Sequence, residues 1–488
     1  MKLNYKRTIF VGFAFFLISA FWGAYDAIVP LALTNHFGLP QDVSGAIMSL
    51  DNILAVFMLP IFGALSDKVN SKYGKRTPFV FIGTVLAVVA FACLSLIDNF
   101  QLSKVLEANA LIPELRAEAT ALLEKANELH NSDMRIAAET MHNKVTEMTL
   151  EITKASIGPL VGFIGVLLVT LIAMATFRSP AVALMPDVTI KPLRSKGNAV
   201  INLMGTAGGI IVLVFGMIFG TSANLYMQYT GYILAVCAVM VIGLVIFAVF
   251  VKENKWAKEM QDETERLGLE EKPEAVDEKE VRKLSKSERT SLILILLSVA
   301  FWYIGYNAIT SKYSVYATNI LGFDYNLTLI IAQAAAVISY IPVGMLASKI
   351  GRRRSILIGV AILTTAFLSA SFINSASSPI LMYIIFILAG IGWATINVNS
   401  FPMVVELAKG GDVGKYTGYY YTASMAAQIV TPILSGVLIE RVVKSWSIFF
   451  PYAAFFVALS FVTMYFVKHG DAKADKVSAL EALGGADD

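Results

Sequence analysis

The feature that most constrains this chain is a series of long apolar runs, each long enough to cross a lipid bilayer as a helix. A hydrocarbon core is spanned by about 20 apolar helical residues. Runs of this kind recur along all 488 residues, of which 56% are hydrophobic and only 15% are charged. Soluble globular proteins do not have this composition. The sequence therefore predicts an all-α membrane protein that crosses the bilayer many times.

The predicted spans fall into two sets of six. The first set covers 8–33, 43–66, 78–97, 157–186, 197–221 and 228–252. The second set covers 289–311, 325–347, 355–376, 379–406, 415–440 and 445–468. The first run is too long for the apolar region of a signal peptide and lacks a small-residue cleavage site, so we expect it to remain as a spanning helix.

Two polar segments interrupt the spans and set the expected domain organisation. Residues 98–156 are rich in Ala, Leu, Glu and Lys, so we expect a small helical extracytoplasmic insertion that serves as a spacer or cap rather than as a binding domain. Residues 252–288 form a polar cytoplasmic linker. It separates an N-terminal half (1–251) from a C-terminal half (289–468), which is followed by a cytoplasmic tail (469–488).

Basic residues gather in alternate short loops, which orients the spans. They precede span one and follow spans two, four and eight, whereas the loops 34–42 and 221–230 contain no Lys or Arg. The basic residues are Lys2, Lys6, Arg7, Lys68, Lys72, Lys75, Arg76, Lys191, Arg194, Lys196, Lys349, Arg352, Arg353 and Arg354. Because Lys and Arg concentrate in cytoplasmic loops, we expect a multi-pass protein of the plasma or inner membrane with both termini in the cytoplasm.

The two halves of the sequence resemble each other. Tyr25 and Tyr306 follow matching Phe-Trp pairs and are 281 positions apart (306 − 25), and Gly63 and Gly344 are separated by the same number (344 − 63). A weaker match after spans four and ten is offset by less, because the insertion 98–156 has no counterpart in the second half. Twofold repetition of six-helix units is typical of carriers that rock around a central site.

The loop after span two carries the most specific local pattern. It runs from Gly63 through Asp67, Gly74, Lys75 and Arg76 to a proline. Topology alone explains its basic residues, but not the glycines and the aspartate, which suit close helix approach, a tight turn and an ion pair at a helix end. We expect a latch that forms and breaks during transport. The predicted gate and latch residues are Gly63, Asp67, Gly74, Lys75, Arg76, Asp187, Gly344, Arg352, Arg353 and Glu406.

This loop resembles the signature between helices two and three of the major facilitator superfamily, and Gly344 to Arg354 resembles its weaker second copy. Within that superfamily, Tyr-Gly-Lys-Arg-Thr-Pro and the segment 179–187 are similar to sucrose-transporter and related glycoside–cation symporters. The resemblance implies two six-helix halves around a central cavity, and uptake of a glycoside with a proton or sodium ion. Plant sucrose carriers have an arginine at the position of Val182, whereas this chain has Arg178, which leaves the sugar and the coupling open.

Two carboxylates lie inside the predicted spans. Asp26 and Asp51 sit at similar depths, roughly 10–12 Å below the outer boundary at 1.5 Å per residue. Ionisable groups are costly at this depth, which favours a functional role over that of satisfied structural groups. Together they can share a proton or bind Na⁺, and melibiose-type symporters, which the chain resembles, also use carboxylates on these helices. In the repeat, Asp26 corresponds to the neutral Asn307.

Arg178 lies towards the cytoplasmic half of span four. It can bond sugar hydroxyls, pair with a carboxylate or extend to the inner surface. Its depth differs from that of Asp26, which argues against a direct pair.

Sugars need hydrogen-bonding side chains and an aromatic face for their C–H surface. Single aromatic residues in membrane helices more often serve in packing or at the interface. As a set, however, the aromatic and amide residues within the spans predict a polar, aromatic-lined cavity. The predicted substrate-binding residues are Trp22, Tyr25, Arg178, Trp302, Tyr306, Asn307, Gln333, Trp393, Asn397 and Gln428.

Several classes of function are excluded or disfavoured. The chain has no G-x-x-x-x-G-K-[ST] loop, so ATP is not its energy source. Its two cysteines, Cys93 and Cys237, lie within apolar runs and form neither a disulfide framework nor a metal cluster. With a formal net charge of +3, nothing indicates nucleic acid. We expect a monomeric transporter, not an enzyme, whose partners are a sugar and the bilayer, with no cofactor or metal besides the coupling ion.

Two other readings stay open. An efflux antiporter of the same fold predicts a large apolar pocket and no dependence on sugar. A non-transporting sensor would more often carry a substantial cytoplasmic domain than a short polar linker and tail. An intramembrane enzyme comes last.

Overall fold

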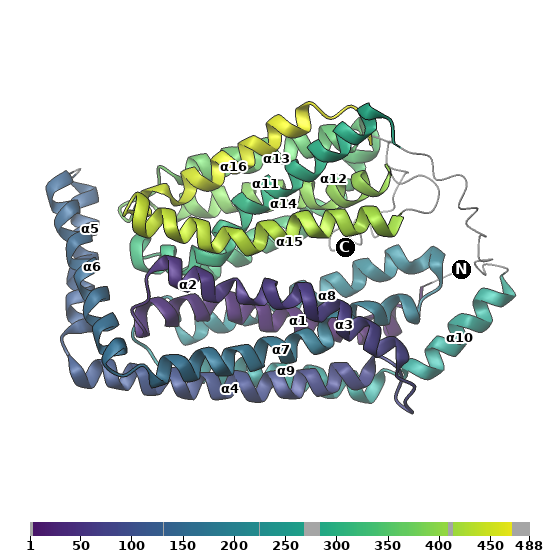
Figure 1. Cartoon of the computed structure of the whole chain (residues 1–488), viewed down its shortest axis with the longest axis horizontal. Helices are drawn as coiled ribbons and strands as arrows, with labels where there is room; N and C mark the ends of the chain where they lie inside the picture. Colours follow the sequence, from purple (N-terminus) through teal and green to yellow (C-terminus); the bar gives the residue numbers. More distant parts are fainter. Residues whose placement is uncertain (1–2, 130, 224, 268–283, 408–412, 471–488) are drawn as a thin grey trace.

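The computed structural model describes residues 3–129, 131–223, 225–267, 284–407 and 413–470, which are almost entirely helical. Within these residues, twelve helical segments are long and apolar enough to cross a membrane. Figure 1 shows them side by side in an elongated bundle. The prediction of an all-α protein with twelve spans is confirmed. The expected tail, apart from its first two residues, and residues 268–283 of the linker lie outside the described residues.

The N-terminal half contains six spans. Its helices are α1 (Tyr5–Leu31), α2 (Gln41–Met48), α3 (Leu50–Lys68), α4 (Thr77–Ala108), α7 (Gly158–Asp187), α8 (Arg194–Phe219) and α9 (Thr230–Phe250). Helices α2 and α3 together form one span. Helix α1 packs against α8 and α9, and α4 packs against α7 and α9.

The C-terminal half also contains six spans. Its helices are α11 (Lys286–Tyr316), α12 (Tyr325–Ile350), α13 (Arg352–Ala370), α14 (Pro379–Val405), α15 (Val413–Val437) and α16 (Phe449–Tyr465). Helix α11 packs against α15 and α16, and α13 packs against α14 and α16. The two halves meet where α2 contacts α15, α8 contacts α12 and α1 contacts α11.

Small residues bring helices within one half close together. A Cβ atom at Gly208 in α8 would lie 2.5 Å from the carbonyl oxygen of Phe16 in α1, so these two backbones touch directly. Between membrane helices, where burial of apolar surface gives little drive to associate, such close packing stabilises the contact.

The repeat is visible in how α1 and α11 end. Each passes into a π-helical turn, Ala32–His36 after α1 and Ala317–Leu321 after α11. A glycine with positive φ follows each turn, Gly38 at 65° and Gly322 at 68°, a conformation that favours glycine. Equivalent helices in the two halves therefore share the same local ending.

The two ends of the bundle differ. At one end, α5 (Ile112–Glu128) and α6 (Ser132–Ala155) form a helical hairpin that stands across the bundle; α10 (Glu253–Arg266), which follows α9, lies at the opposite end (Figure 1). We call these the hairpin end and the linker end. The basic loops after α3 and α7 lie at the linker end.

Several predicted spans end elsewhere in the structure; span seven, expected at 289–311, continues as α11 to Tyr316. Helix α4 continues to Ala108, well beyond the expected end at 97, because Leu102 and Val105 are still buried. Helix α13 ends at Ala370 rather than 376, where Asn374 forms a turn by accepting the backbone N–H of Ala376. The hairpin is therefore carried on an extension of α4 rather than on a loop.

Candidate substrate cavity and its gates

A cavity of about 190 Å³ lies between the two halves. Helices α1, α2, α3 and α7 line it from the N-terminal half, and α11 and α15 line it from the C-terminal half. The lining residues are Trp22, Tyr25, Asp26, Met48, Asp51, Asn52, Arg178, Asn307, Thr310, Ser311, Gln428 and Pro432. Most of these side chains are polar, so the cavity suits a hydrogen-bonding solute.

The two predicted coupling carboxylates share this cavity. Asp26 comes from α1 and Asp51 from α3, and both line the same space. Asp26 is exposed, although it lies deep in a spanning helix next to the fully buried Tyr25. An Oδ1 atom of Asp51 accepts a hydrogen bond from Asn52 at 2.7 Å. The carboxylate of Asp26 is therefore accessible to a solute or ion in the cavity.

Arg178 joins the carboxylates, although its depth along the sequence suggested separation. Its guanidinium carbon lies 5.7 Å from the ring centroid of Trp22, and it lines the same cavity as Asp26 and Asp51. The expected difference in depth was based on the Cα position of Arg178 in α7. Its long side chain brings the charge to a different depth from that Cα. The cation–π contact with Trp22 favours this position.

The C-terminal half contributes neutral polar groups. The side-chain amide of Asn307 donates to the backbone carbonyl of Gln428 at 3.2 Å, and Thr310 donates its hydroxyl to Asn307 Oδ1 at 3.2 Å. Five lining residues were not predicted from the sequence: Met48, Asn52, Thr310, Ser311 and Pro432. The helical spacing held a signal for two of them, because positions three and four residues after Asn307 lie on the same face of α11.

Five predicted substrate residues are not among those lining the cavity. Trp302 is buried and stacks on Tyr303, with ring centroids 3.8 Å apart. Tyr306 stacks on Trp393 at 5.9 Å. Gln333 lies against Gly209 of α8, and Asn397 is half-buried in α14. The aromatic members of this group therefore pack against other aromatic rings, Trp302 within α11 and Tyr306 against Trp393 of α14.

Polar contacts between the halves close the bundle at the hairpin end. The buried Lys312 of α11 donates to the carbonyl oxygen of Gln41 at 3.0 Å, and the backbone N–H of Gln41 donates to Glu440 at 3.1 Å. Arg441 pairs with Asp42 through two nitrogens, at 2.6 and 2.5 Å. We call these five residues the hairpin-end gate.

Two glycines let the backbones of the hairpin-end gate come together. A Cβ atom at Gly45 in α2 would collide with the carbonyl oxygen of Pro432 in α15, and one at Gly436 would collide with that of Gln41. The crossing of α2 and α15 is therefore backbone against backbone, which leaves little room for a solute to pass.

A second set of contacts closes the same end between α8 and α12. The hydroxyls of Thr221 and Tyr325 lie 2.7 Å apart, and Ser222 donates to Asp324 at 2.8 Å. Because the hairpin end is sealed here and at the hairpin-end gate, the exposed Asp26 is reached from the linker end. We interpret the conformation as open towards the linker end.

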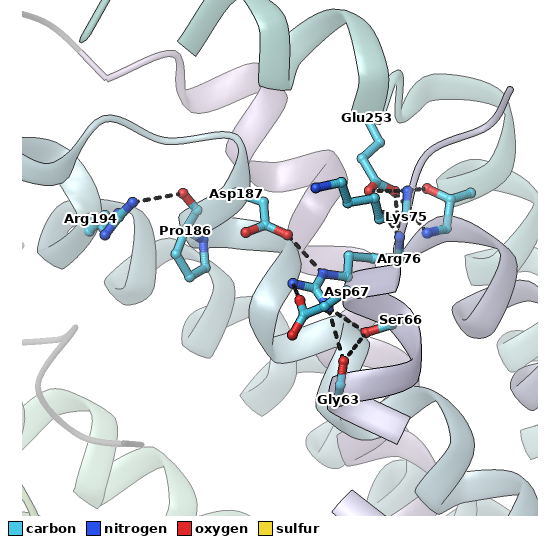
Figure 2. Close-up of polar contacts among 10 residues, drawn as sticks. Gly63, Ser66, Asp67, Lys75, Arg76, Pro186, Asp187, Arg194 and Glu253 are labelled. Carbon is cyan, nitrogen blue, oxygen red and sulfur yellow. Dashed lines mark hydrogen bonds and ion pairs between the residues drawn. The ribbon is translucent and has the colours of Figure 1, made fainter. Parts of the chain in front are cut away.

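Predicted latch residues meet at the linker end, as Figure 2 shows. Arg76 donates to Asp187 of α7 at 2.8 Å and to Asp67 of α3 at 2.5 Å. It also contacts the carbonyl oxygen of Gly63 at 3.5 Å and the hydroxyl of Ser66. Burial alone would lower the pKa of Arg76, but the bonds to Asp187 and Asp67 raise it above its ordinary value. One cation thus ties together three helices of the N-terminal half.

Glu253, which the sequence reading missed, holds the other side of this loop (Figure 2). Its buried carboxylate accepts the backbone N–H groups of Lys75 at 2.6 Å, Arg76 at 2.9 Å and Thr77 at 2.8 Å, and also the Thr77 hydroxyl. An acidic group at the start of α4 satisfies its free N–H groups. The sequence shows Glu253 only as an acidic residue directly after span six. Its hydrogen-bond partners are mainly backbone N–H groups, which no sequence pattern reveals.

The weaker copy of the latch lies in the C-terminal half. Arg352 pairs with Glu406 at 3.2 Å, which joins the start of α13 to the end of α14. Arg353 donates to the carbonyl oxygen of Met464 at 3.4 Å, and Gly344 is buried within α12. This copy connects helices of its own half, as the first copy does.

Comparison with known families identifies this architecture. The family model described as Major Facilitator Superfamily matches residues 152–408 and 325–483. The chain belongs to the major facilitator superfamily. Membership in this superfamily makes the protein a multi-pass membrane transporter rather than an enzyme. A second model, described as MFS/sugar transport protein, matches residues 11–110.

Individual members of the superfamily resemble the chain more weakly. Proton-associated sugar transporter A of Homo sapiens is 31% identical over 96 residues, which cover 20% of this chain and 12% of that protein. The inward-open xylose transporter XylE from E. coli matches with a TM-score of 0.62 at 12% identity, covering 98% of this chain and 99% of that chain. A D-xylose-proton symporter matches with a TM-score of 0.62 at 14% identity, and the match covers 96% of this chain and 99% of that chain. At these identities the solved structures show the fold alone.

Proposed function

We propose that the protein takes up a sugar or glycoside together with a proton or sodium ion by alternating access. The observation that carries this proposal is the cavity in which Asp26, Asp51 and Arg178 of one half face neutral polar groups of the other. Charged groups deep in membrane helices are costly and are retained where they serve transport. The hairpin end and the linker end would open to this cavity in turn.

The cavity has the chemistry that a sugar requires. Asn307, Thr310, Ser311 and Gln428 offer donors and acceptors on one side. On the other side, Trp22 offers an aromatic face for the C–H surface of a sugar ring. The match of residues 11–110 to the sugar-transport model supports this substrate class. A disaccharide or another glycoside is the substrate we expect.

Asp26 and Asp51 are the groups that we assign to ion coupling. Two carboxylates in one cavity repel each other, and a proton or Na⁺ bound between them relieves this repulsion. Neutralising the pair also weakens its attraction for Arg178, which can then bond sugar hydroxyls. The names of two similar proteins, proton-associated sugar transporter A and the D-xylose-proton symporter, mention a proton, which is consistent with this assignment. No cofactor besides the ion is needed.

The setting in the cell follows from the basic loops. We propose that the linker end, where these loops lie, faces the cytoplasm and that the hairpin faces outward. The protein would then sit in the plasma or inner membrane with both termini inside, as a monomer. The branch of glycoside–cation symporters is the one that fits its loop pattern.

An efflux antiporter remains the second reading of the fold. It would require a large apolar cavity for amphipathic solutes, whereas the lining between the halves is small and polar. The cavity therefore favours a sugar. A sensor would need no accessible coupling group, yet Asp26 is exposed.

The substrate class is tested by uptake into proteoliposomes with an imposed proton or sodium gradient. We expect accumulation of labelled mono- or disaccharides under one of the gradients and none of amphipathic cations. Gln428→Ala should raise the half-saturating concentration of the sugar at least several-fold, whereas Asp262→Asn in α10 is a control far from the cavity. If no sugar accumulates but amphipathic solutes are moved, the efflux reading replaces this proposal.

A further inference from the structure

Arg116 in α5 is a buried cation surrounded by neutral acceptors. Its side chain is 3% exposed. Nη1 donates to the carbonyl oxygen of His142 at 3.2 Å and to the hydroxyl of Thr146 at 3.1 Å, both on α6. Nη2 donates to Oδ1 of Asn35 at 3.4 Å, and Nε has no hydrogen-bond partner among the described residues. Burial lowers the pKa of Arg116 to about 10, so the group remains charged at neutral pH.

Among the described residues, no acidic group pairs with Arg116. A buried charge of this kind is costly, so its position calls for a role beyond joining α5 to α6. Of the hydrogen bonds that Arg116 makes to described residues, the one with Asn35 leaves the hairpin. This residue belongs to the π-helical turn Ala32–His36 that ends α1, the first helix of the transport bundle. Arg116 thus connects the hairpin to a spanning helix of the N-terminal half.

The hairpin is fastened to that same turn by further bonds. The hydroxyl of Thr153 in α6 donates to the carbonyl oxygen of Phe37 at 2.9 Å. Gln101 of α4 links the same parts, because its side-chain amide donates to the hydroxyl of Thr153 at 2.8 Å and to the carbonyl oxygen of His36 at 3.1 Å. Gly38, with φ at 65°, passes so close to α6 that its Cβ would lie 2.5 Å from the backbone nitrogen of Leu150. The hairpin and the end of α1 therefore form one unit.

Asn35 also makes a contact across the two halves. Asn319 lies in the π-helical turn that ends α11, and its Nδ2 donates to Oδ1 of Asn35 at 2.8 Å. In the reverse direction, Asn35 Nδ2 donates to Asn319 Oδ1 at 3.5 Å. Both side chains are buried. The pair joins equivalent turns of the repeat and must separate when the hairpin end opens.

Oδ1 of Asn35 is the atom that both contacts share. It accepts from Arg116 on one side and from Asn319 on the other. A guanidinium has only donors, so it can face the oxygen of the amide but not its NH₂ group. Arg116 thereby fixes which way the amide of Asn35 points, and the orientation it fixes is the one that pairs with Asn319.

We propose that the α5–α6 hairpin is a working part of the closure at the hairpin end, in which Arg116 is a positioning residue that orients Asn35 for its contact with Asn319. This inference rests on the proposed alternating-access function. Without Arg116 the amide of Asn35 can rotate, the contact between the halves weakens, and the hairpin end opens more readily. The insertion then tunes the opening of the transporter rather than merely capping it.

The experiment measures how fast a thiol in the cavity reacts from the hairpin side. Ser311→Cys provides the thiol in a Cys93→Ser, Cys237→Ala background, reconstituted in sealed vesicles with a membrane-impermeant maleimide outside. Glu124→Cys on the exposed face of α5, in a separate preparation without the cavity thiol, identifies vesicles whose hairpin faces outward. We expect Arg116→Gln to raise the labelling rate of the cavity thiol about five-fold, the effect of losing one such hydrogen bond. Lys125→Gln, which removes an exposed charge from the same helix, should not change it.

A coupling test separates positioning from general support of the hairpin. Asn319→Ala should raise the labelling rate by a similar factor, and adding Arg116→Gln to it should cause no further rise, because both act through one contact. Rates that multiply in the double variant, or an unchanged rate in folded Arg116→Gln, would overturn the proposal. If Arg116→Gln does not fold, Arg116→Lys serves, since a single ammonium cannot reproduce both arms of the guanidinium.

The labelling experiment needs no sugar. Failure of sugar uptake with coupled labelling would reject the proposed substrate but keep this gate. Normal sugar uptake with an unchanged labelling rate in Arg116→Gln would keep the proposed substrate and reject the role of Arg116.

Discussion

The carboxylate of Glu253 occupies the space that a side chain at Gly74 would need. Gly74 has a φ of 124°, and a Cβ atom there would collide with that carboxylate. Two constraints therefore require glycine at position 74: the backbone conformation, and the close approach of an acidic side chain from α10. A residue outside the motif thus explains a residue within it.

The first prediction concerns this contact. Glu253→Ala leaves the N–H groups at the start of α4 without their acceptor, which should lower the free energy of unfolding by about 2 kcal/mol. Thermal unfolding in detergent measures the loss. Glu253→Gln keeps one acceptor oxygen and should lose less. Equal stability of Glu253→Ala and the unchanged protein would show that the cap has no energetic role.

The second prediction concerns Arg76. Arg76→Lys cannot reach Asp67 and Asp187 together, so the three helices that it joins should come apart more easily at the linker end. We expect the maximal uptake rate to fall about ten-fold while the half-saturating sugar concentration stays the same, because the cavity is untouched. Lys72→Gln in the same loop is the control, since Lys72 is exposed. A raised half-saturating concentration instead would place Arg76 in the substrate path.

The third prediction concerns the crossing of α2 and α15. Gly436→Val places a side chain against the carbonyl oxygen of Gln41, so the hairpin end should no longer close. Net uptake should fall at least ten-fold, and a cavity thiol should label faster from the hairpin side. Gly418→Val in the same helix meets no atom within 4 Å and should transport normally. Equal uptake by the two variants would show that this crossing does not need to close.

The fourth prediction concerns pH. Burial, and then the charge of Arg116, lower the pKa of His142 well below its usual 6.5. The folded hairpin thus binds fewer protons than the unfolded chain, so its stability is full above pH 6.5 and declines as the pH falls below that value. Amide protection factors of α5 and α6, which correct for the slower intrinsic exchange at low pH, should be lower at pH 5 than at pH 7.5, and the drop should exceed that in the bundle. His142→Asn should remove much of this difference; an unchanged difference would assign it to other groups.

Much of the fold was predictable because its signals are local. The twelve apolar runs, and the repeat around Tyr25 and Tyr306, can be found in the sequence without knowing which residues are in contact. The spans are helical because exposing polar backbone groups to lipid is costly. The end of α4 was not predictable in this way. Its last turn packs against α6, where Val105 and Val145 share an apolar cluster, and the composition of this segment does not reveal that contact.

The candidate site was predictable only in part. Asp26, Asp51 and Asn307 stood out as polar groups in apolar helices, and the structure places them together. Trp302 and Trp393 carried the same kind of signal but pack against other aromatic rings. The periodicity of a sequence predicts which residues share a face of a helix, but not which residues of other helices that face contacts. For the same reason the contact between Arg116 and Asn35, which joins residues far apart in the chain, had no signal in the sequence.

Coupling of the ion by Asp26 and Asp51 is tested most directly by comparing exchange with accumulation. Asp26→Asn and Asp51→Asn are reconstituted beside the unchanged protein, and sugar is followed both by exchange between equal concentrations and by uptake under an imposed proton or sodium gradient. We expect both variants to exchange sugar but to lose gradient-driven accumulation. Accumulation at the unchanged level in both variants would contradict the assignment and place the coupling elsewhere.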